Sequence, residues 1–465
     1  MRVLLVACYE LGHQPLAVAA PAARLRARSH DVRCLDLSVQ PFDPDLVAWA
    51  ERVALSVPMH TATRLAKDTI AAIRLRRGDL PICCFGLYAA MTAGVADACL
   101  AGETDDALAA WVEEPEPLQA GPVTPVVLLG RAAARPGAPV PARDLLPDLA
   151  QYARLRVDGE ERLVAHVEAS HGCAHRCRHC PVPVVYDGRI RIVDAEAVLA
   201  DVAQQVELGA RHVTFGDPDF LNGVHHSTRV ARELHRRWPD LTWDCTTKVE
   251  HVLRHRELWD ELAALGCLFV VSAFETVDDA LLTRLAKGHT AADAADAVDL
   301  LHARGITVRP SWLPFTPWTT PADVAAILEF VAEHDLVGAV DPVQYTIRLL
   351  LPAGSLLLRD PDLSPQLGPY DDELGSYRWS APDPGLDELQ ARLADLVEQA
   401  TADRTPIGET FDAVRVACGL APVHPDPSVE RVPGLTEAWF CCAEPTSGQR
   451  RGLAGCAGAT GAAAR

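Results

Sequence analysis

Three closely spaced cysteines are the residues of this chain best suited to chemistry. Cys173, Cys177 and Cys180 lie in the segment Glu-Ala-Ser-His-Gly-Cys-Ala-His-Arg-Cys-Arg-His-Cys-Pro, with the spacing C-x3-C-x2-C. Three thiolates can hold three irons of a [4Fe–4S] cluster, and the fourth iron then stays open to another ligand. A loop that wraps a cluster must turn tightly, which suits Gly172 before the cysteines and Pro181 after them.

Two other interpretations of these cysteines were weighed. The same segment contains His171, His175 and His179, so it could form a zinc site. Zinc sites, however, usually combine two short Cys or His pairs from separated segments. The other alternative is three unrelated thiols. A position directly after a predicted barrel strand favours the cluster over both alternatives.

A second pair of thiols lies near the C-terminus. Cys441 and Cys442 are adjacent in Ala-Trp-Phe-Cys-Cys-Ala-Glu-Pro-Thr, residues 438–446. A disulfide between neighbours is strained, so we expect a dithiol that binds a thiophilic atom, acts as a redox pair or reacts at a radical site. Burial as two small apolar side chains is the alternative. Cys83 and Cys84 are also adjacent, but their apolar strand pattern predicts burial.

Composition limits the classes of protein that fit. A chain of 465 residues suggests two or three domains, and its net charge of -20 argues against nucleic acid as a partner. The apolar run Val3–Ala7 is too short for a signal peptide, and no run reaches the ~18 residues that a membrane span needs. We therefore expect a cytoplasmic protein with no membrane partner. In that compartment fourteen cysteines indicate metal or redox chemistry more than a disulfide framework.

The elements that must position these residues begin with an N-terminal α/β region. Short apolar runs alternate with helical patterns at Pro15–Arg28 and Ala62–Arg77, which predicts a doubly wound, Rossmann-like domain over residues 1–112. A Pro-rich linker is expected over residues 113–150. The predicted strands of this domain are Val3–Ala7, Asp31–Asp36, Arg52–Ser56 and Ile82–Phe85.

A second alternating region predicts a partial (β/α)6 TIM barrel over residues 151–350. Its expected strands are Val164–Ser170, His212–Phe215, Leu241–Cys245, Cys267–Ala273, Ile306–Leu313 and Val343–Leu349. Its expected helices are Ala195–Leu208, Ser227–Arg237, Arg256–Leu265, Asp278–Ala286, Ala291–Arg304 and Pro321–His334. Asp194 is expected to cap the first of these helices and Gly209 to end it. Residues 351–465 are Pro-rich, and we expect a less regular region there.

The cysteine motif and the strand pattern of residues 150–350 resemble the radical S-adenosylmethionine (SAM) superfamily. The resemblance implies that SAM chelates the open iron through its amino and carboxylate groups. It also implies that an electron from the cluster cleaves a C–S bond of SAM, usually to a 5′-deoxyadenosyl radical. A reductase such as flavodoxin or ferredoxin is the implied electron donor. His179 stands where the family usually has an aromatic residue next to the adenine.

The resemblance also implies further SAM contacts at the ends of the barrel strands. The loop after the second strand, which contains Phe215, Gly216 and Asp217, matches the one that contacts the SAM amino group. Glu275, after the fourth strand, is expected to hydrogen-bond the ribose. Lys248, after the third, is expected to reach the SAM carboxylate. The alternatives are an ordinary Gly-Asp-Pro turn and satisfied charges on the barrel rim.

The N-terminal domain resembles the cobalamin-binding domain that precedes many radical SAM barrels. The segment Leu-Ala-Gly-Glu-Thr-Asp-Asp-Ala-Leu at residues 100–108 contributes to this resemblance. The signature Asp-x-His-x-x-Gly is absent from the chain, and the neighbours of His13 do not fit it. Cobalamin binding and a structural or lid role are thus both open. No G-x-G-x-x-G follows the first strand, which argues against a dinucleotide site.

The tail resembles a narrower group of radical SAM proteins that end in Cys-Cys-Ala-Glu-Pro or its selenocysteine form. The sequence therefore predicts a radical SAM enzyme that acts on a small molecule, with Cys441 and Cys442 acting on substrate or intermediate. One alternative is aminocarboxypropyl transfer from SAM to an arsenic, selenium or sulfur acceptor. The other is a non-catalytic iron–sulfur or metal-binding sensor.

Overall fold

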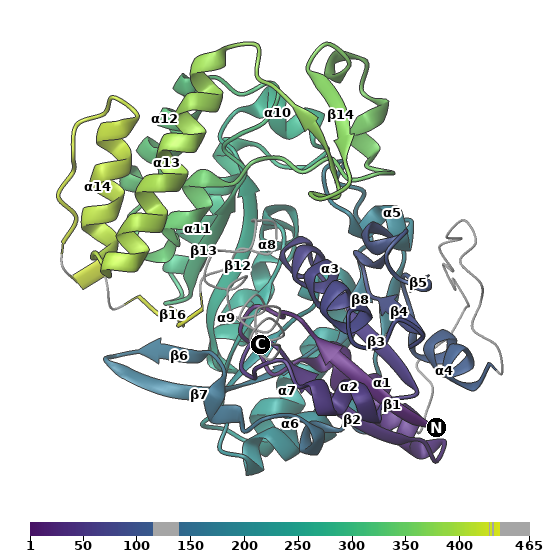
Figure 1. Ribbon diagram of the computed structural model, residues 1–465. Helices are drawn as coiled ribbons and strands as arrows, with labels where there is room; N and C mark the ends of the chain where they lie inside the picture. The colour runs from purple at the N-terminus through teal and green to yellow at the C-terminus, as the bar shows by residue number, and fades with distance from the viewer. Residues whose placement is uncertain (115–138, 427, 430–431, 438–465) are drawn as a thin grey trace.

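The computed structural model describes residues 1–114, 139–426, 428–429 and 432–437, and it contains two large sheets (Figure 1). The first sheet is parallel throughout, with the order β2-β1-β3-β4-β5. Its strands are β1 (Arg2–Ala7), β2 (Asp31–Asp36), β3 (Arg52–Ser56), β4 (Ile82–Phe85) and β5 (Ala98–Leu100). This is a doubly wound order that reverses between β1 and β3. The predicted N-terminal fold is confirmed, with β5 as an additional strand.

The strands of this sheet are apolar because helices cover both faces. The helices are α1 (Leu16–Ala27), α2 (Pro44–Trp49), α3 (His60–Arg74) and α4 (Asp105–Glu113). Along β1, Val3 and Leu5 enter one hydrophobic core and Leu4 and Val6 enter the other. Burial on both faces explains why these strands read as continuous apolar runs rather than alternating ones.

The second sheet curls into a half-barrel of order β13-β12-β11-β10-β7-β6-β16 (Figure 1). Its parallel strands are β7 (Glu160–Val167), β10 (His212–Phe215), β11 (Thr242–Thr246), β12 (Cys267–Glu275) and β13 (Thr307–Trp312). Two antiparallel strands, β6 (Arg154–Val157) and β16 (Gly434–Leu435), extend it at the β7 edge. The predicted partial barrel is confirmed.

One predicted barrel strand was wrong. Residues 343–349 do not continue the sheet, which ends at β13 among the described residues. A 3₁₀ turn, Pro342–Thr346, occupies most of this segment, and a single bridge joins Phe315 to Arg348. Pro342 has no backbone N–H to donate to a neighbouring strand. The side-chain carbonyl of Gln344 accepts a hydrogen bond from the backbone N–H of Trp312, the last residue of β13.

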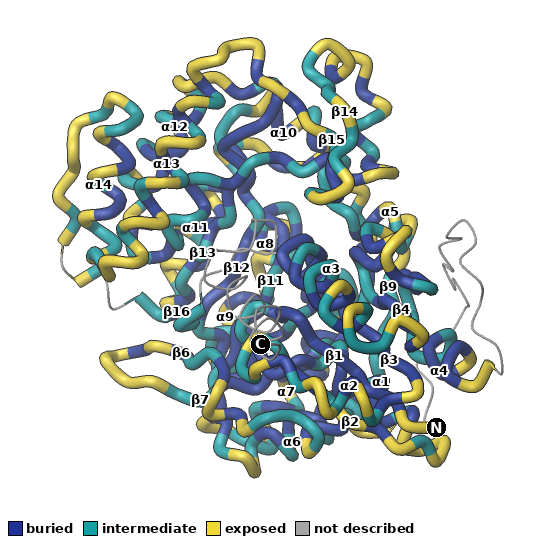
Figure 2. The backbone as a smooth tube through the Cα atoms, viewed as in Figure 1, coloured by how far each residue is buried: buried dark blue, intermediate teal, exposed yellow. Residues whose placement is uncertain are grey.

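Helices cover the outside of the half-barrel, and buried strands alternate with exposed helix surfaces (Figure 2). They are α6 (Ala195–Glu207), α7 (Val224–Arg237), α8 (Val249–Arg254), α9 (Trp259–Ala264), α10 (Asp279–Arg284), α11 (Ala291–His302) and α12 (Pro321–Glu333). Asp194 caps α6 by accepting from Ala197 N, and Gly209 follows its end with φ +103, as predicted. None of the helices in the described ranges is long and apolar enough to cross a membrane.

The C-terminal region is more regular than its composition suggested. It contains a hairpin of β14 (Leu367–Asp371) and β15 (Ser376–Trp379) and two helices, α13 (Pro384–Asp403) and α14 (Ile407–Ala417). Leu386, Leu389 and Leu393 bury one face of α13 in the core of the half-barrel. Pro361 and Pro384 lie at helix starts, where their fixed φ is tolerated, and Pro369 lies within β14.

A buried arginine joins the two sheets. Arg143 is 2% exposed, and its guanidinium forms a two-point ion pair with Asp201 of α6 at 3.1 and 2.9 Å. The same side chain donates to the carbonyl oxygens of Gln14, after β1, and His166, in β7. One side chain therefore satisfies groups from three elements, which fixes how the N-terminal sheet sits on the half-barrel.

Candidate functional site

The three cysteines lie in the connection that leaves the carboxyl end of β7. This connection contains β8 (Ser170–Gly172), α5 (Val182–Tyr186) and β9 (Ile190–Ile192), and β8 pairs antiparallel with β9. Gly172 has φ +74, and a Cβ there would lie 2.4 Å from Arg189 O and 2.6 Å from the ring of Tyr186. Only glycine fits this turn, in agreement with its predicted role.

The described cysteines are free thiols, and those of the loop lie close enough to influence one another. Cys173 and Cys177 are buried, and Cys180 is half-buried. Burial raises the pKa of Cys173 and of Cys180, and the negative charge of Cys177 raises both further. Three thiolates in this space need a cation to compensate them, which is the requirement that iron meets. The donor set fits a [4Fe–4S] cluster.

Glu275, at the end of β12, forms a charged group with His179 and Lys287. Its Oε1 accepts from Lys287 Nζ at 3.0 Å and lies 3.0 Å from His179 Nε2. Burial opposes the charge of Glu275, but Lys287 and His179 overcome it and hold the pKa of the carboxyl well below its ordinary value. Glu275 also has φ +67, an uncommon conformation for a side chain of this size. The structure thus brings together two predicted site residues, His179 and Glu275, and one that was not predicted, Lys287.

Sequence reasoning missed Lys287, although the sequence contained a signal for it. The chain has 43 lysine and arginine residues, of which only Lys67, Lys248 and Lys287 are lysines. Lys248 and Lys287 are both buried near the cysteine loop. Two of the three lysines thus lie beside the cysteine loop, so the rarity of lysine in this chain was a partial signal.

The loop after β10 holds the predicted residues Phe215, Gly216 and Asp217. A Cβ at Gly216 would lie 2.4 Å from His166 Nε2, so this position must be glycine. Asp217 is 1% exposed and accepts from Ala169 N at 2.8 Å and from Ser170 Oγ at 2.6 Å, so it supports the start of the cysteine loop. Burial raises its pKa to about 7. Phe215 packs on aromatic rings in the core.

Lys248 precedes α8 and points toward the cysteine loop. Its Nζ lies 3.4 Å from Glu250 Oε2. Burial and then the charge of Lys248 lower the pKa of His175 to about 4, so the lysine is electrostatically close to the loop. A Cβ at Gly288 would lie 3.8 Å from Lys248 Nζ, which puts this lysine beside the turn that carries Lys287.

A cavity of about 330 Å³ lies between the carboxyl ends of the two sheets. The loops after β1, β3, β4 and β5 line one side, and the loops after β7 and β10 line the other. Its polar lining includes Glu10, Glu103, Asp105, His166, Glu168 and His171. Ligands of doubly wound sheets and of barrels bind at these carboxyl ends, so the cavity combines the binding edges of both folds.

An ion-pair network crosses this cavity. His171, in β8, lies 3.0 Å from Glu103 Oε1 and 3.1 Å from Glu168 Oε2. Tyr186 also donates to Glu103 at 3.0 Å. Burial opposes the charge of His171, but the two carboxylates raise its pKa well above the ordinary value. The N-terminal sheet therefore contacts the loop that carries the cysteines, a contact that no sequence pattern predicted.

The remaining predicted thiols and His13 have different outcomes. Cys83 and Cys84 are fully buried in β4, as predicted, and burial raises both pKa values. His13 stacks on His166 with a ring separation of 4.4 Å at the floor of the cavity, and burial lowers its pKa to about 4. Cys441 and Cys442 lie outside the described residues, so their predicted role stays a prediction.

Comparison with known families and proteins gives a consistent result. The family model of the radical SAM superfamily matches residues 167–331. The hopanoid C-3 methylase of Methylococcus capsulatus is 23% identical over 333 residues, which cover 66% of this chain and 62% of that protein. The chain matches 62% and 52% of the lengths of two curated relatives, less than two thirds of each.

Two solved structures share the fold. The radical SAM methyltransferase TsrM of Kitasatospora setae, with tryptophan and a SAM analogue bound, aligns with a TM-score of 0.58 at 20% identity, over 72% of this chain and 71% of that one. The cobalamin-dependent radical SAM enzyme OxsB, with aqua-cobalamin bound, aligns with a TM-score of 0.65 at 15% identity, over 86% and 67%. Residues 167–331, which include the cysteine loop and strands β10 to β13, therefore match the radical SAM superfamily, whose enzymes use a [4Fe–4S] cluster and S-adenosylmethionine, and the two solved structures share the fold.

Proposed function

We propose that this chain is a radical SAM enzyme that modifies a small molecule held between its two sheets. Cys173, Cys177 and Cys180 hold the cluster at the carboxyl end of β7. The observation that carries the proposal is the meeting of this buried thiol loop with the charged group of Glu275 and Lys287. SAM carries an ammonium, a carboxylate and a sulfonium. A cation and a carboxylate beside three thiols can pair with these charges.

The chain's own residues prepare the cluster site. When bound, the cluster supplies the single electron that cleaves a C–S bond of SAM. Gly172 permits the tight turn into the loop, and Asp217 holds the preceding residues through two hydrogen bonds. Lys287 lies close enough to Cys177 and Cys180 for their charges to raise its pKa, so it offsets part of the thiolate charge. Burial of the loop excludes water from the site.

SAM would lie across the rim between the ends of β10, β11 and β12. Glu275 can accept hydrogen bonds from the ribose hydroxyls, and His179 can lie against the adenine. Lys248 is placed to pair with the carboxylate of SAM. The missing side chain at Gly216 makes room for the ring of His166, and the backbone of this loop is the predicted contact for the amino-acid end of SAM. Phe215 and Asp217 support this loop from the core.

A second candidate, cobalamin-dependent methyl transfer, is favoured by the cavity between the sheets. The methylase and TsrM carry methyl-transfer names, and OxsB binds cobalamin. In this chain the cavity adjoins the switch point between β1 and β3, where doubly wound sheets bind their ligands. A corrinoid there would supply a methyl carrier within reach of the SAM site. Gly102 lies on its wall, where a Cβ would meet only Val185 Cγ1 at 3.5 Å, so a large planar group can approach the backbone there.

The test is product analysis after anaerobic reconstitution with iron and sulfide, then addition of SAM and dithionite. We expect 5′-deoxyadenosine from the intact chain and none from a Cys173→Ala, Cys177→Ala, Cys180→Ala variant. Cys418→Ala, which removes a thiol from the distant end of α14, is the matched control. Methylthioadenosine in place of 5′-deoxyadenosine would support aminocarboxypropyl transfer. A complete cluster with no SAM cleavage would support the other alternative, a non-catalytic iron–sulfur or metal-binding sensor.

The methyl-transfer candidate has its own measurement. Purified chain would be loaded with hydroxocobalamin, freed of excess by gel filtration and examined by absorption spectroscopy. Bound cobalamin together with S-adenosylhomocysteine formation supports methyl transfer. Failure to retain cobalamin argues against this candidate and leaves the proposed SAM cleavage intact.

A further inference from the structure

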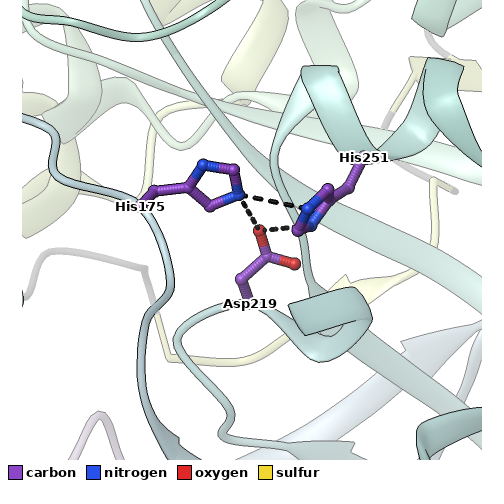
Figure 3. Close-up of side chains that lie close together, drawn as sticks. All are labelled: His175, Asp219 and His251. Carbon is purple, nitrogen blue, oxygen red and sulfur yellow. Dashed lines mark hydrogen bonds and ion pairs between the residues drawn. The ribbon is translucent and has the colours of Figure 1, made fainter. Parts of the chain in front are cut away.

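Two histidines and an aspartate converge beside the cysteine loop (Figure 3). His175 lies between two of the cysteines, Asp219 follows β10, and His251 belongs to α8 after β11. The Nε2 atoms of the two histidines are 3.2 Å apart, and Asp219 Oδ2 lies 3.7 Å from His175 Nε2 and 2.9 Å from His251 Nδ1. Three separate segments thus direct one potential ligand atom each at a common point.

Distances of this size occur between the ligands of a small metal ion, and one of the two His251 ring nitrogens would be the ligand. Ligands at about 2.0–2.1 Å from a tetrahedral ion lie roughly 3.3 Å from one another. Each residue offers one ligand atom, and the three atoms lie within 4.8 Å of one another. Imidazole nitrogen and carboxylate oxygen are also a donor set that divalent zinc and iron accept.

Hydrogen bonds among the described residues satisfy this group only poorly. The side chain of Asp219 is fully buried, and its Oδ2 lies 2.9 Å from His251 Nδ1, but neither atom is in hydrogen-bond geometry with any described residue. His251 is itself 5% exposed. A buried carboxylate oxygen that has an ion-pair neighbour but no well-aligned hydrogen bond is costly, so a ligand that satisfies it is expected.

Neighbouring groups hold these side chains in place. Asp219 Oδ1 accepts from Thr247 Oγ1 at 2.8 Å and from Leu221 N at 3.1 Å, which leaves Oδ2 directed at the histidines. Glu250 Oε2 lies 3.6 Å from His175 Nδ1. Outer carboxylates that face the far nitrogen of a ligating histidine are a regular feature of metal sites, because they fix the ring and raise its basicity.

We propose that His175, Asp219 and His251 form a site for one divalent transition-metal ion, of which Zn²⁺ is the probe. Three protein ligands leave at least one coordination position open to water or another small ligand. The ion would fasten the cysteine loop to the ends of β10 and β11. This proposal uses none of the three cysteines, so it does not rest on the proposed function.

The test uses the holoenzyme, so that the cysteines are occupied by their cluster. The reconstituted protein is given one equivalent of Zn²⁺, passed through gel filtration and analysed for zinc, iron and sulfide. We expect about one zinc per chain in the wild type. His251→Gln and Asp219→Asn should lower the bound zinc at least tenfold, with iron and sulfide unchanged. His255→Gln is the matched control, because His255 neighbours His251 in sequence and space but is not one of the three ligands.

Zinc-edge X-ray absorption keeps the proposal testable if a variant fails to fold. Nitrogen and oxygen neighbours near 2.0–2.1 Å, with no sulfur, are expected for this site. A sulfur shell near 2.3 Å would put the zinc on cysteines and overturn the proposal. So would a wild-type holoenzyme that retains no zinc, or zinc that His251→Gln and Asp219→Asn retain. The triple cysteine variant should keep its zinc even though it forms no cluster, which separates this site from the proposed catalytic one.

Discussion

The two sheets of this molecule use their strands differently. In the N-terminal sheet, residues 3–7 of the central strand β1 are apolar and buried on both faces, and the polar residue of this strand, Arg2, lies at its exposed start. In the half-barrel, polar side chains lie within the strands themselves. His212 of β10 and Asp244 of β11 are 2.8 Å apart, and Thr214 donates to the same carboxylate oxygen of Asp244.

Curvature explains this difference. A flat sheet covered by helices on both sides presents two apolar faces, so chemistry is confined to its carboxyl edge. A curled sheet turns one face inward, where no helix covers it, and polar groups there must satisfy one another. The N-terminal sheet thus contributes a wall to the cavity, and the half-barrel contributes both a wall and the charged rim that surrounds the cysteine loop.

The largest expected effect comes from breaking the charged group of Glu275, His179 and Lys287 at the rim of the half-barrel. Lys287→Met leaves Glu275 buried beside the thiolates without its cation, so we expect at least a hundredfold loss of 5′-deoxyadenosine formation, about 3 kcal/mol. Lys67→Met, in α3 of the N-terminal sheet, is the matched control and should change the rate less than twofold. Equal losses in the two variants would contradict a special role for the rim.

The next largest effect is on the joint between the sheets. Arg143→Met removes one partner of a buried ion pair and two hydrogen bonds to backbone carbonyls, so we expect a loss of about 3–5 kcal/mol. Thermal unfolding and limited proteolysis should detect it as early release of the N-terminal sheet. Arg232→Met breaks an exposed ion pair with Glu261 and should leave the melting temperature almost unchanged. An effect of Arg143→Met no larger than that would mean that the joint depends on other contacts.

The interior of the half-barrel should respond more weakly. Asp244→Asn keeps the shape but replaces an acceptor shared by His212 and Thr214, so we expect a loss of roughly 1–3 kcal/mol in chemical denaturation. Asp45→Asn, on exposed α2 of the N-terminal region, should change stability by less than about 0.5 kcal/mol. If both variants match the wild type, the polar inner face contributes nothing to stability.

The smallest effect is a pH dependence at the edge of the N-terminal sheet. Burial, assisted by the charge of Glu168, raises the pKa of Glu10 to about 8. The folded pKa exceeds the unfolded value of about 4.3, so the folded state binds more protons between them, and stability falls as the pH rises through this window. Glu10→Gln has no such proton, so the melting temperature of the wild type relative to this variant should fall by a few degrees from pH 5 to 8. A constant difference would contradict the raised pKa.

The sequence predicted elements with strong local patterns and missed those that depend on distant partners. The bounds of β3, β4 and β10 were predicted to the residue, because each is a short buried run between turns, and the bounds of β2 were also correct although Asp31 and Arg33 are exposed. Strands β5 and β16, with three and two residues, are too short for any periodicity and exist through pairing with β4 and β6. The segment 343–349 failed in the opposite way, since its apolar pattern suits a strand but Pro342 starts a 3₁₀ turn.

The same limit applies to the site. The cysteine spacing is local, so the loop could be read directly from the sequence. His179 and Glu275 were each named, but their 3.0 Å contact requires the actual curvature of the sheet. Asp219 and His251 each follow a predicted strand, and neighbouring strands bring their ends together, so this proximity could have been inferred from the strand order. Only the direction of the side chains required the structure.

The pairing of β16 with β6 has a consequence for synthesis on the ribosome. Leu435 pairs with Leu155, 280 positions earlier in the chain, so the β6 edge gains this neighbour only after residue 435 has been made. Until then the hairpin of β6 and β7 presents unpaired backbone groups that other chains can bind. Contacts this distant in sequence also slow folding. Charged side chains on this hairpin, among them Arg154, Glu160 and Glu161, suit an edge that must stay unpaired until its strand arrives.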